Sequence, residues 1–240
     1  MKIALIGYGK MGKAVEAYAL DRGHQVVLKI DAGNKNDFTD ANLKQCDVAI
    51  EFTSPASALD NIEKCFNAGL PLVCGTTGWY DHLEEVKNSC KSRNAAFIYA
   101  SNFSIGVNIF FAVNQYVAKL MNAYPDYNVS IEEIHHLQKL DKPSGTAITL
   151  ANDILKQIQG KKNWKLANGE INPGELSIGS KREPEVVGTH VVAYTSTIDE
   201  IKLIHKAYNR HGFAQGAVHA AEWLIGKQGF YEMRDMLGLS

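Results

Sequence analysis

The chain has 240 residues, of which 45% are hydrophobic and 21% are charged, and its formal net charge is −1. This composition is typical of a soluble globular protein with one large domain or two modest ones. The near-neutral charge gives no electrostatic basis for nucleic-acid binding, and no apolar run approaches the roughly eighteen residues of a transmembrane helix. We therefore expect no nucleic-acid partner and no membrane association.

The cysteines and the first residues indicate a cytoplasmic protein. The apolar run at the N-terminus is interrupted by glycines after six residues, which predicts a strand and a turn rather than a signal peptide. The four cysteines form no CxxC pair: Cys46, Cys65, Cys74 and Cys90. We expect them to be reduced thiols, and we expect no metal site.

The first hundred residues alternate between strand and helix patterns. Short apolar runs predict strands over 2–7, 25–30, 47–52, 70–75 and 95–100, and helical patterns lie between them over 10–22, 55–68 and 80–92. Such alternation predicts βαβ units and a parallel sheet with helices on both faces. The expected fold class is therefore α/β, with an N-terminal Rossmann-type dinucleotide-binding domain.

After residue 106 the pattern changes to α+β. Helices are predicted over 108–124 and 144–159, a strand over 127–136, a loop over 168–174, and two long strands over 185–208 that join near Asp199 and Glu200. We expect a substrate-binding and oligomerisation domain with an open mixed sheet over 107–213. The alanine-rich helix over 214–226 is expected to return to the first domain, which then comprises 1–106 and 214–240.

A glycine-rich turn follows the first predicted strand. Gly7, Gly9 and Gly12 match G-x-G-x-x-G between a strand and a helix, which is the context in which this motif binds a dinucleotide. The pyrophosphate then meets free amides at a helix N-terminus. Asp31 ends the second strand, where a carboxylate binds the adenine-ribose hydroxyls and repels a 2′-phosphate. NADH is therefore favoured, although Lys29 and Lys35 keep NADPH open.

Two further polar segments follow strands on the expected cofactor edge. "GTTG" contains Gly75, Thr76 and Thr77, and "ASNF" consists of Ala100, Ser101, Asn102 and Phe103. In a doubly wound sheet the ligand lies outside the carboxyl ends of the strands. These segments either line a nicotinamide site or serve only as turns. Glu51, at the end of the third strand, either contacts the cofactor or caps the next helix.

The stretch "EEIHHLQKLDKPSGTA" (132–147) concentrates proton donors and cations ahead of a helix start. His135 and His136 point to opposite faces if a strand precedes them, and a histidine titrates near neutrality. Lys139 can bind a carboxylate, and Ser144 is a candidate N-cap. Free amides at Gly145 and Thr146 can bind a second carboxylate. We interpret this stretch as a carboxylate-binding site beside a proton donor. His190, His205 and His211 are interpreted as structural histidines.

The order of these motifs resembles the dihydrodipicolinate reductase family along nearly the whole chain. It is carried by the glycine turn, "EFTSP", "GTTG", "ASNFSIGVN", "EIHHLQKLDKPSGTA" and "NRHGFAQGAVHAAEWL", of which the HH-x-x-K-x-D-x-PSGTA part is the most specific. The resemblance implies reduction of 4-hydroxy-tetrahydrodipicolinate to tetrahydrodipicolinate with NADH or NADPH, in lysine and diaminopimelate biosynthesis. It also implies a homotetramer assembled through the sheet of the second domain.

The resemblance also implies roles for individual residues. His135 would be the general acid, Lys139 a second donor and charge partner, and His136, Gly145 and Thr146 would hold the dicarboxylate substrate. The cofactor would be held by Asp31, by "GTTG" and "ASNF", and by the whole glycine turn: Gly7, Tyr8, Gly9, Lys10, Met11 and Gly12.

This sequence departs from the family pattern at a few positions. The glycine loop is one residue shorter than in many members, with Lys10 in place of an arginine, and Glu51 replaces a commoner aspartate. "REPEVVGTHVV" matches the family's R-x-G…G-E-H segment loosely, with Thr189 in place of the glutamate. Two other functions are compatible with a dinucleotide-binding fold. One is another NAD-dependent amino- or imino-acid dehydrogenase, which leaves the PSGTA motif unexplained. The other is a non-catalytic NAD(H) sensor, which has no need of His135 beside Lys139.

Overall fold

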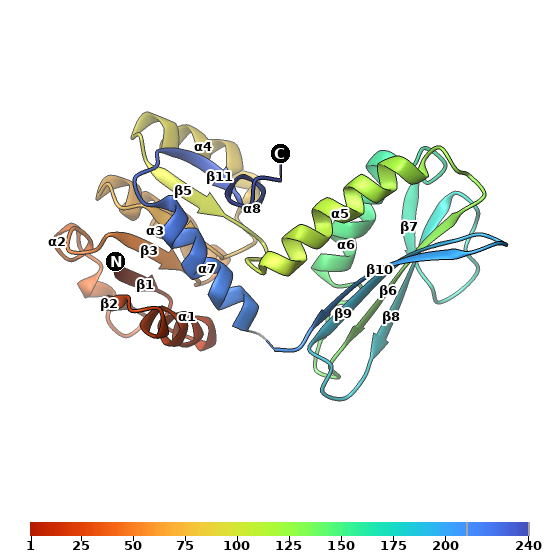
Figure 1. Ribbon diagram of the computed structural model, residues 1–240. Helices are drawn as coiled ribbons and strands as arrows, with labels where there is room; N and C mark the ends of the chain where they lie inside the picture. The colour runs from red at the N-terminus through yellow and green to blue at the C-terminus, as the bar shows by residue number, and fades with distance from the viewer. Residues whose placement is uncertain (210, 240) are drawn as a thin grey trace. The chain divides into compact units, whose positions relative to one another are not determined.

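The computed structural model describes residues 1–209 and 211–239, and these form two compact units (Figure 1). The first unit contains residues 1–105 and the described residues after 210, and the second contains the described residues of 106–210. The change in sequence pattern places the corresponding divisions after residues 106 and 213. Every helix among the described residues is too short or too polar to span a bilayer.

The first unit is built on a six-stranded sheet in which every neighbouring pair is parallel. In spatial order its strands are β11 (Gly229–Glu232), β5 (Ala96–Tyr99), β4 (Leu72–Cys74), β3 (Val48–Glu51), β1 (Lys2–Ile6) and β2 (Gln25–Ile30). Five of these strands are predicted by the sequence. The sixth, β11, is a four-residue strand after the last long helix, and it pairs with β5.

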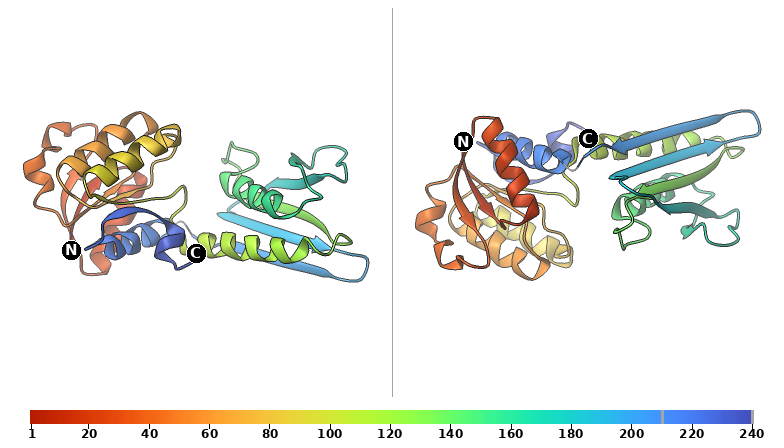
Figure 2. Two further views of the ribbon diagram at one scale, coloured as in Figure 1. Left: turned by 90° about the horizontal axis from the view of Figure 1, so that it is seen from above. Right: turned by 90° about the horizontal axis from the view of Figure 1, so that it is seen from below.

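Helices cover both faces of this sheet (Figure 2). On one face lie α1 (Lys10–Asp21) and α7 (His211–Leu224), and on the other lie α3 (Pro55–Asn67) and α4 (Leu83–Ser92). Shorter helical segments complete the unit: η1 (Lys35–Asp37), α2 (Asp40–Leu43), η2 (Tyr80–His82) and α8 (Met233–Met236). The alternating apolar residues of β1 divide between the two cores, with Ala4 and Ile6 on one side and Ile3 and Leu5 on the other. The predicted Rossmann-type fold is confirmed.

The second unit contains a five-stranded open sheet. Its spatial order is β10 (Glu200–Ala207), β9 (Gly188–Thr195), β6 (Asn128–His135), β8 (Glu175–Arg182) and β7 (Asn163–Leu166). The central strand β6 pairs parallel with β8 and antiparallel with β9, so the sheet is mixed, as predicted. The turn between β9 and β10 also falls at the predicted place. The strands β7 and β8 were not anticipated.

One face of the second sheet carries the core of this unit. Helices α5 (Ile105–Met121) and α6 (Gly145–Gln157) pack on it, around buried residues such as Ile131, Ile178 and Val192 (Figure 2). Because side chains alternate along a strand, β6 directs Val129, Ile131, Glu133 and His135 to this same face. The apolar core therefore continues into a carboxylate and an imidazole at the end of β6.

Candidate active site

The glycine turn after β1 has the tight packing that the motif requires. Gly7 has a φ of +91°, and a Cβ there would lie 1.9 Å from the carbonyl oxygen of Phe52. A Cβ on Gly12 would lie 2.3 Å from the Gly7 carbonyl oxygen, whereas nothing lies within 4 Å of a Cβ on Gly9. The turn is therefore closed by Gly7 and Gly12 and open beside Gly9, which fits a pyrophosphate at this position.

The start of α1 can accept an anion. Its first helical residue is Lys10, its N-cap Gly9 offers no side-chain oxygen to the first amides, and its first turn carries no acid. The amides at the start of a helix lack intrahelical acceptors, and the helix dipole adds partial positive charge there. Met11 packs against the neighbouring core. The residues present therefore fit a dinucleotide.

Asp31 lies where a ribose contact was predicted. It follows the last residue of β2, its side chain is exposed, and Gly7 N donates to the carbonyl of Ile30 at 2.9 Å, which places the turn beside this strand end. The nearby Lys29 is paired with Glu16 at 2.6 Å and lies 4.7 Å from the centre of the Tyr8 ring. The Tyr8 hydroxyl donates to the same glutamate. The cation nearest to Asp31 in sequence is thus already neutralised.

The two polar segments at the ends of β4 and β5 are partly structural. Thr76 is buried, and its hydroxyl donates to Glu51 Oε1 at 2.9 Å and accepts from Thr53 N at 2.7 Å. Phe103 is 1% exposed and packs edge-to-face on Phe52. Both side chains therefore serve the packing of these loops. The cofactor roles of their neighbours stay predictions: Gly75, Thr77, Ala100, Ser101 and Asn102.

Glu51 is neither exposed for a cofactor contact nor the N-cap of the next helix. It is fully buried, and its carboxylate accepts from Thr53, Thr76, Asn61 and the Cys74 thiol. The N-cap of α3 is Ser54 instead. Glu51 joins the loops after β3 and β4 from inside the sheet edge, because the hydroxyls of Thr53 and Thr76 both donate to its Oε1.

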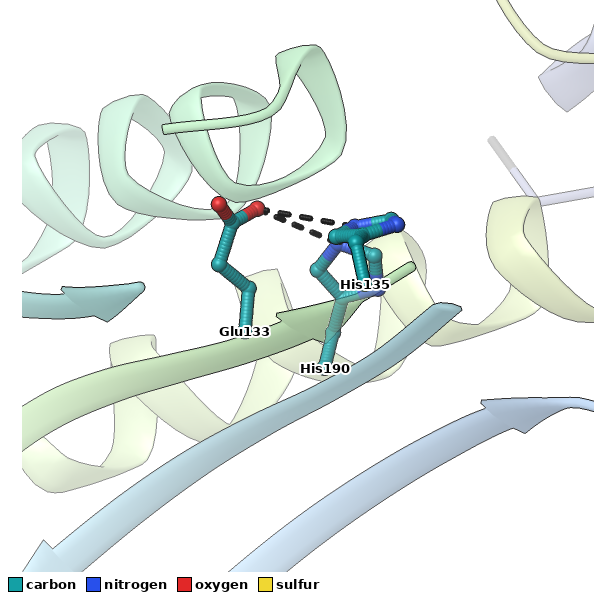
Figure 3. Close-up of side chains that lie close together, drawn as sticks. All are labelled: Glu133, His135 and His190. Atoms are coloured by element: carbon teal, nitrogen blue, oxygen red, sulfur yellow. Dashed lines mark hydrogen bonds and ion pairs between the residues drawn. The ribbon is translucent and has the colours of Figure 1, made fainter. Parts of the chain in front are cut away.

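In the second unit, His135 lies in a buried polar cluster at the end of β6 (Figure 3). Its Nε2 lies 3.3 Å from His190 Nε2 on β9 and 3.6 Å from Glu133 Oε2. Its Nδ1 lies 3.3 Å from the carbonyl oxygen of Val187, which can only accept a hydrogen bond, so Nδ1 carries a proton. A Cβ on Gly188 would lie 2.9 Å from His135 Cε1, so this glycine makes room for the ring.

The carboxylate of Glu133 is fixed by donors on β8 and at the start of α6. Oε1 accepts from Ser180 Oγ at 2.7 Å and lies 3.4 Å from Arg182 Nη1, both on β8. Oε2 accepts from Ser144 N at 2.9 Å. Burial raises the pKa of this carboxyl, but hydrogen bonds from Ser144 and Ser180 and the charge of His135 outweigh it and leave the pKa below its usual value. Glu133 is therefore ionised at neutral pH.

The pKa values of the two histidines are both lowered, that of His190 by more. Burial lowers the pKa of His135, Glu133 raises it, and Lys139 and Arg182 lower it, with a net decrease. Burial and the charge of His135 lower the pKa of His190 to about 3, against the opposing effect of Glu133. His190 is thus a neutral ring at working pH, and His135 is the histidine of the pair that takes up a proton.

Among the described residues, Glu133, His135 and His190 form a group whose ligand atoms are close enough for a metal ion. Both oxygens of Glu133 already accept hydrogen bonds, and the Arg182 guanidinium lies beside one of them. A cation would have to displace these donors and face a fixed positive charge. We interpret the group as a hydrogen-bonded cluster, and the absence of a metal site stays a prediction.

The remaining residues of the stretch lie around this cluster. The Ser144 hydroxyl accepts from Ala147 N at 3.2 Å, which confirms it as the N-cap of α6, and lies 3.1 Å from His190 Nε2. The first two residues of α6 are Gly145 and Thr146, so their amides lie at the helix start. Lys139 Nζ is paired with Asp141 at 2.7 Å, and His136 follows β6 directly. The structure therefore joins the start of α6 to the cluster through Ser144, and the substrate roles of His136, Lys139, Gly145 and Thr146 stay predictions.

Several residues of the cluster were missed by the sequence analysis. Glu133, Ser180 and Arg182 were not considered, and His190 was interpreted as structural although its ring contacts His135. Two signals could have found them. Glu133 precedes His135 by two residues and so shares its strand face, and Arg182 and His190 are the arginine and histidine of the family segment quoted above.

Family models and sequence relatives match nearly the whole chain. The family model described as dihydrodipicolinate reductase, N-terminus, matches residues 1–103, and the model for its C-terminus matches residues 106–237. A 4-hydroxy-tetrahydrodipicolinate reductase of Christiangramia forsetii is 51% identical over 99% of this chain and 98% of that protein. One of Neisseria gonorrhoeae is 35% identical over 94% of this chain and 84% of that protein.

Solved structures share the fold. A dipicolinate-bound dihydrodipicolinate reductase from Paenisporosarcina sp. TG-14 has a TM-score of 0.78 at 23% identity, over 97% of both chains. An engineered D-amino acid dehydrogenase bound to NADP+ has a TM-score of 0.54 at 14% identity, over 100% of this chain and 96% of that one. From the two family models and the sequence relatives, the chain belongs to the dihydrodipicolinate reductase family, whose members are oxidoreductases that use a pyridine nucleotide.

Proposed function

We propose that this protein reduces 4-hydroxy-tetrahydrodipicolinate to tetrahydrodipicolinate in lysine and diaminopimelate biosynthesis. The observation that carries the proposal is the HH-x-x-K-x-D-x-PSGTA stretch, which folds into one cluster of imidazole, carboxylate, cation and helix start. The 51% identity to a curated reductase over nearly the whole of both chains supports the same reaction.

A pyridine nucleotide bound at the first unit would supply the hydride. The closed turn at Gly7 and Gly12, the open position at Gly9 and the uncapped start of α1 support pyrophosphate binding there. We favour NADH over NADPH because Asp31 would repel a 2′-phosphate while Lys29 is held by Glu16. The residues of "GTTG" and "ASNF" would line the nicotinamide through their backbone.

The substrate is a dicarboxylate, so its site has to compensate two negative charges. We assign one carboxylate to the amides of Gly145 and Thr146 at the start of α6, where the helix dipole is positive. Lys139 would hold the other with His136, exchanging its partner Asp141 for the substrate. Cationic groups at these positions also stabilise the negative charge that hydride addition leaves on the conjugated imine.

His135 would donate the proton that completes the reduction. Both of its ring nitrogens contact protein groups, so one contact has to give way to substrate. The Nδ1 contact to the Val187 carbonyl is a neutral hydrogen bond of 3.3 Å, longer than the usual range. We therefore assign the transferred proton to Nδ1, with Nε2 remaining on the Glu133 side. The lowered pKa of His135 makes its imidazolium a stronger acid.

Assembly as a cytoplasmic homotetramer completes the proposal. The face of the second sheet opposite α5 and α6 carries a row formed by Glu132, Val191 and Ile204, which are register neighbours across β6, β9 and β10. Ile204 is 61% exposed in the isolated chain. We expect copies of the chain to pair through this face. Ile204→Glu should then yield smaller species in size-exclusion chromatography with light scattering, and an unchanged tetramer would contradict this interface.

A coupled spectrophotometric assay tests the reaction itself. The preceding synthase would form the substrate in place from pyruvate and aspartate semialdehyde, and oxidation of NADH and NADPH would be followed in separate samples. We expect rapid oxidation, faster with NADH. The absence of oxidation with either nucleotide, in protein shown to bind NADH, would refute the proposed reaction.

A further inference from the structure

Glu133 is placed to act on His135 rather than on substrate. It is 0% exposed, and its carboxylate is directed at His135 (Figure 3), with Oε2 3.6 Å from His135 Nε2. Donors on β8 and at the start of α6 hold the carboxylate in place. A buried carboxylate held in this way keeps one orientation. It can therefore influence the reaction through the imidazole beside it.

The two ring nitrogens of His135 face different groups. Nδ1 faces the Val187 carbonyl, and Nε2 faces Glu133 and His190. The neutral ring carries its proton on Nδ1, so the proton that charges it is added at Nε2, beside the carboxylate. Loss of the Nδ1 proton to substrate then leaves a neutral ring whose Nε2–H is directed to Glu133.

The charged groups around His135 oppose one another. The two cations are Lys139, on the loop after β6 and paired with Asp141, and Arg182 on β8. The anion on β6 is Glu133. From β9, His190 contributes a neutral ring, with Ser144 and His135 as its partners. The charge of His205 on β10 also lowers the pKa of His190. Among these groups, Glu133 is the anion nearest to His135 Nε2, and burial and both cations work against the imidazolium.

We propose that Glu133 is a positioning residue that orients His135 and favours its protonated form, with His190 as the neutral partner that fixes its ring. The inference rests on the proposed function, because it concerns the residue assigned as general acid. It assigns no substrate contact to Glu133 and no change in its own protonation during turnover.

The test is the pKa of His135, measured by NMR titration of its imidazole resonances in Glu133→Gln. The substitution removes the charge and keeps the shape. An opposite charge within about 4–6 Å shifts a pKa by roughly 1–3 units, so we expect the pKa of His135 to fall by at least about one unit. The alkaline limb of kcat/KM should move by the same amount, which gives about a tenfold loss above that pH.

The chain supplies a matched control and a second variant. Glu132 is adjacent in sequence but on the other sheet face, where it pairs with Lys181, so Glu132→Gln should leave the titration unchanged. Arg182→Gln removes a cation beside Glu133 and should raise the pKa of His135, which keeps the inference testable if Glu133→Gln fails to fold.

An unchanged or raised pKa of His135 in folded Glu133→Gln would overturn the inference, and so would the absence of a rise in Arg182→Gln. The titration needs neither substrate nor turnover. A pKa that falls as expected in a protein without reductase activity would refute the proposed function alone. A pKa that stays constant in an active reductase would refute only the role of Glu133.

Discussion

The glycine turn offers a prediction that separates packing from ligand binding. Gly12→Ala and Gly9→Ala add the same methyl group three residues apart, in very different surroundings. On Gly12 the new Cβ would lie 2.3 Å from the Gly7 carbonyl oxygen, which is backbone and cannot rotate away. On Gly9 the new Cβ meets nothing within 4 Å.

The expected magnitudes follow from these distances. An ordinary contact of a Cβ with an oxygen is longer than 3 Å, so Gly12→Ala forces the turn and α1 apart by several tenths of an ångström or more. Overpacking of this kind costs about 1–3 kcal/mol of folding free energy. Gly9 has a negative φ of −79° that alanine adopts, so Gly9→Ala should cost only the preference of an N-cap for glycine over alanine, about 1 kcal/mol or less.

Nucleotide binding should respond differently from stability. Gly9→Ala fills the space assigned to the pyrophosphate, so its NADH Kd should rise at least about tenfold, equivalent to about 1.4 kcal/mol, in a protein of normal stability. Gly12→Ala should lose both stability and binding. The measurements are urea unfolding and NADH fluorescence titration. A stable Gly12→Ala protein, or a Gly9→Ala protein that binds NADH normally, would refute the reasoning for that position.

Four further changes test other parts of the structure. Glu51→Gln replaces a fully buried acceptor of several hydrogen bonds and should cost about 1–3 kcal/mol in denaturant unfolding, with exposed Glu84→Gln as the neutral control. Ser144→Ala removes the cap of α6 and should cost about 0.5–2 kcal/mol; equal stability would show that the cap contributes little. Asp31→Ala should weaken NADH more than NADPH, and the reverse order would remove Asp31 from the ribose site. Folding lowers the pKa of His190 from its ordinary value of about 6.5 to about 3. Between these two pH values the unfolded chain therefore binds a proton on His190 that the native state does not bind. The native state should therefore lose up to about 1.4 kcal/mol per pH unit as pH falls below about 6.5, a slope that His190→Asn should reduce.

Local sequence signals account for most of the first unit. A strand, a glycine turn and a helix follow one another within residues 2–21, and each element is specified by its own periodicity and by Gly7 and Gly12. The short strand β11 escaped prediction because four residues carry too little periodicity, and its partner β5 lies far away in the sequence. Thr76 and Phe103 were expected near the cofactor, but both side chains are buried, Thr76 against Glu51 and Phe103 against Phe52.

The cluster around His135 was predictable only in part. The stretch 132–147 is contiguous, so its histidines, lysine and helix cap could be recognised from spacing alone. His190 and Arg182 join it through the register of β9 and β8, across 55 residues from His135 and 49 residues from Glu133. Nothing in local pattern specifies which strands become neighbours in a mixed sheet. The mixed pairing of β6 therefore hid the guanidinium of Arg182 and the second imidazole, that of His190.

The most direct test of the account is the turnover of His135→Gln in the coupled assay, together with its NADH Kd. A general acid contributes about 10²–10⁴-fold, so kcat should fall by that factor while NADH binding in the other unit stays intact. Turnover equal to that of the unsubstituted protein would contradict His135 as the proton donor, and with it the central claim about this site.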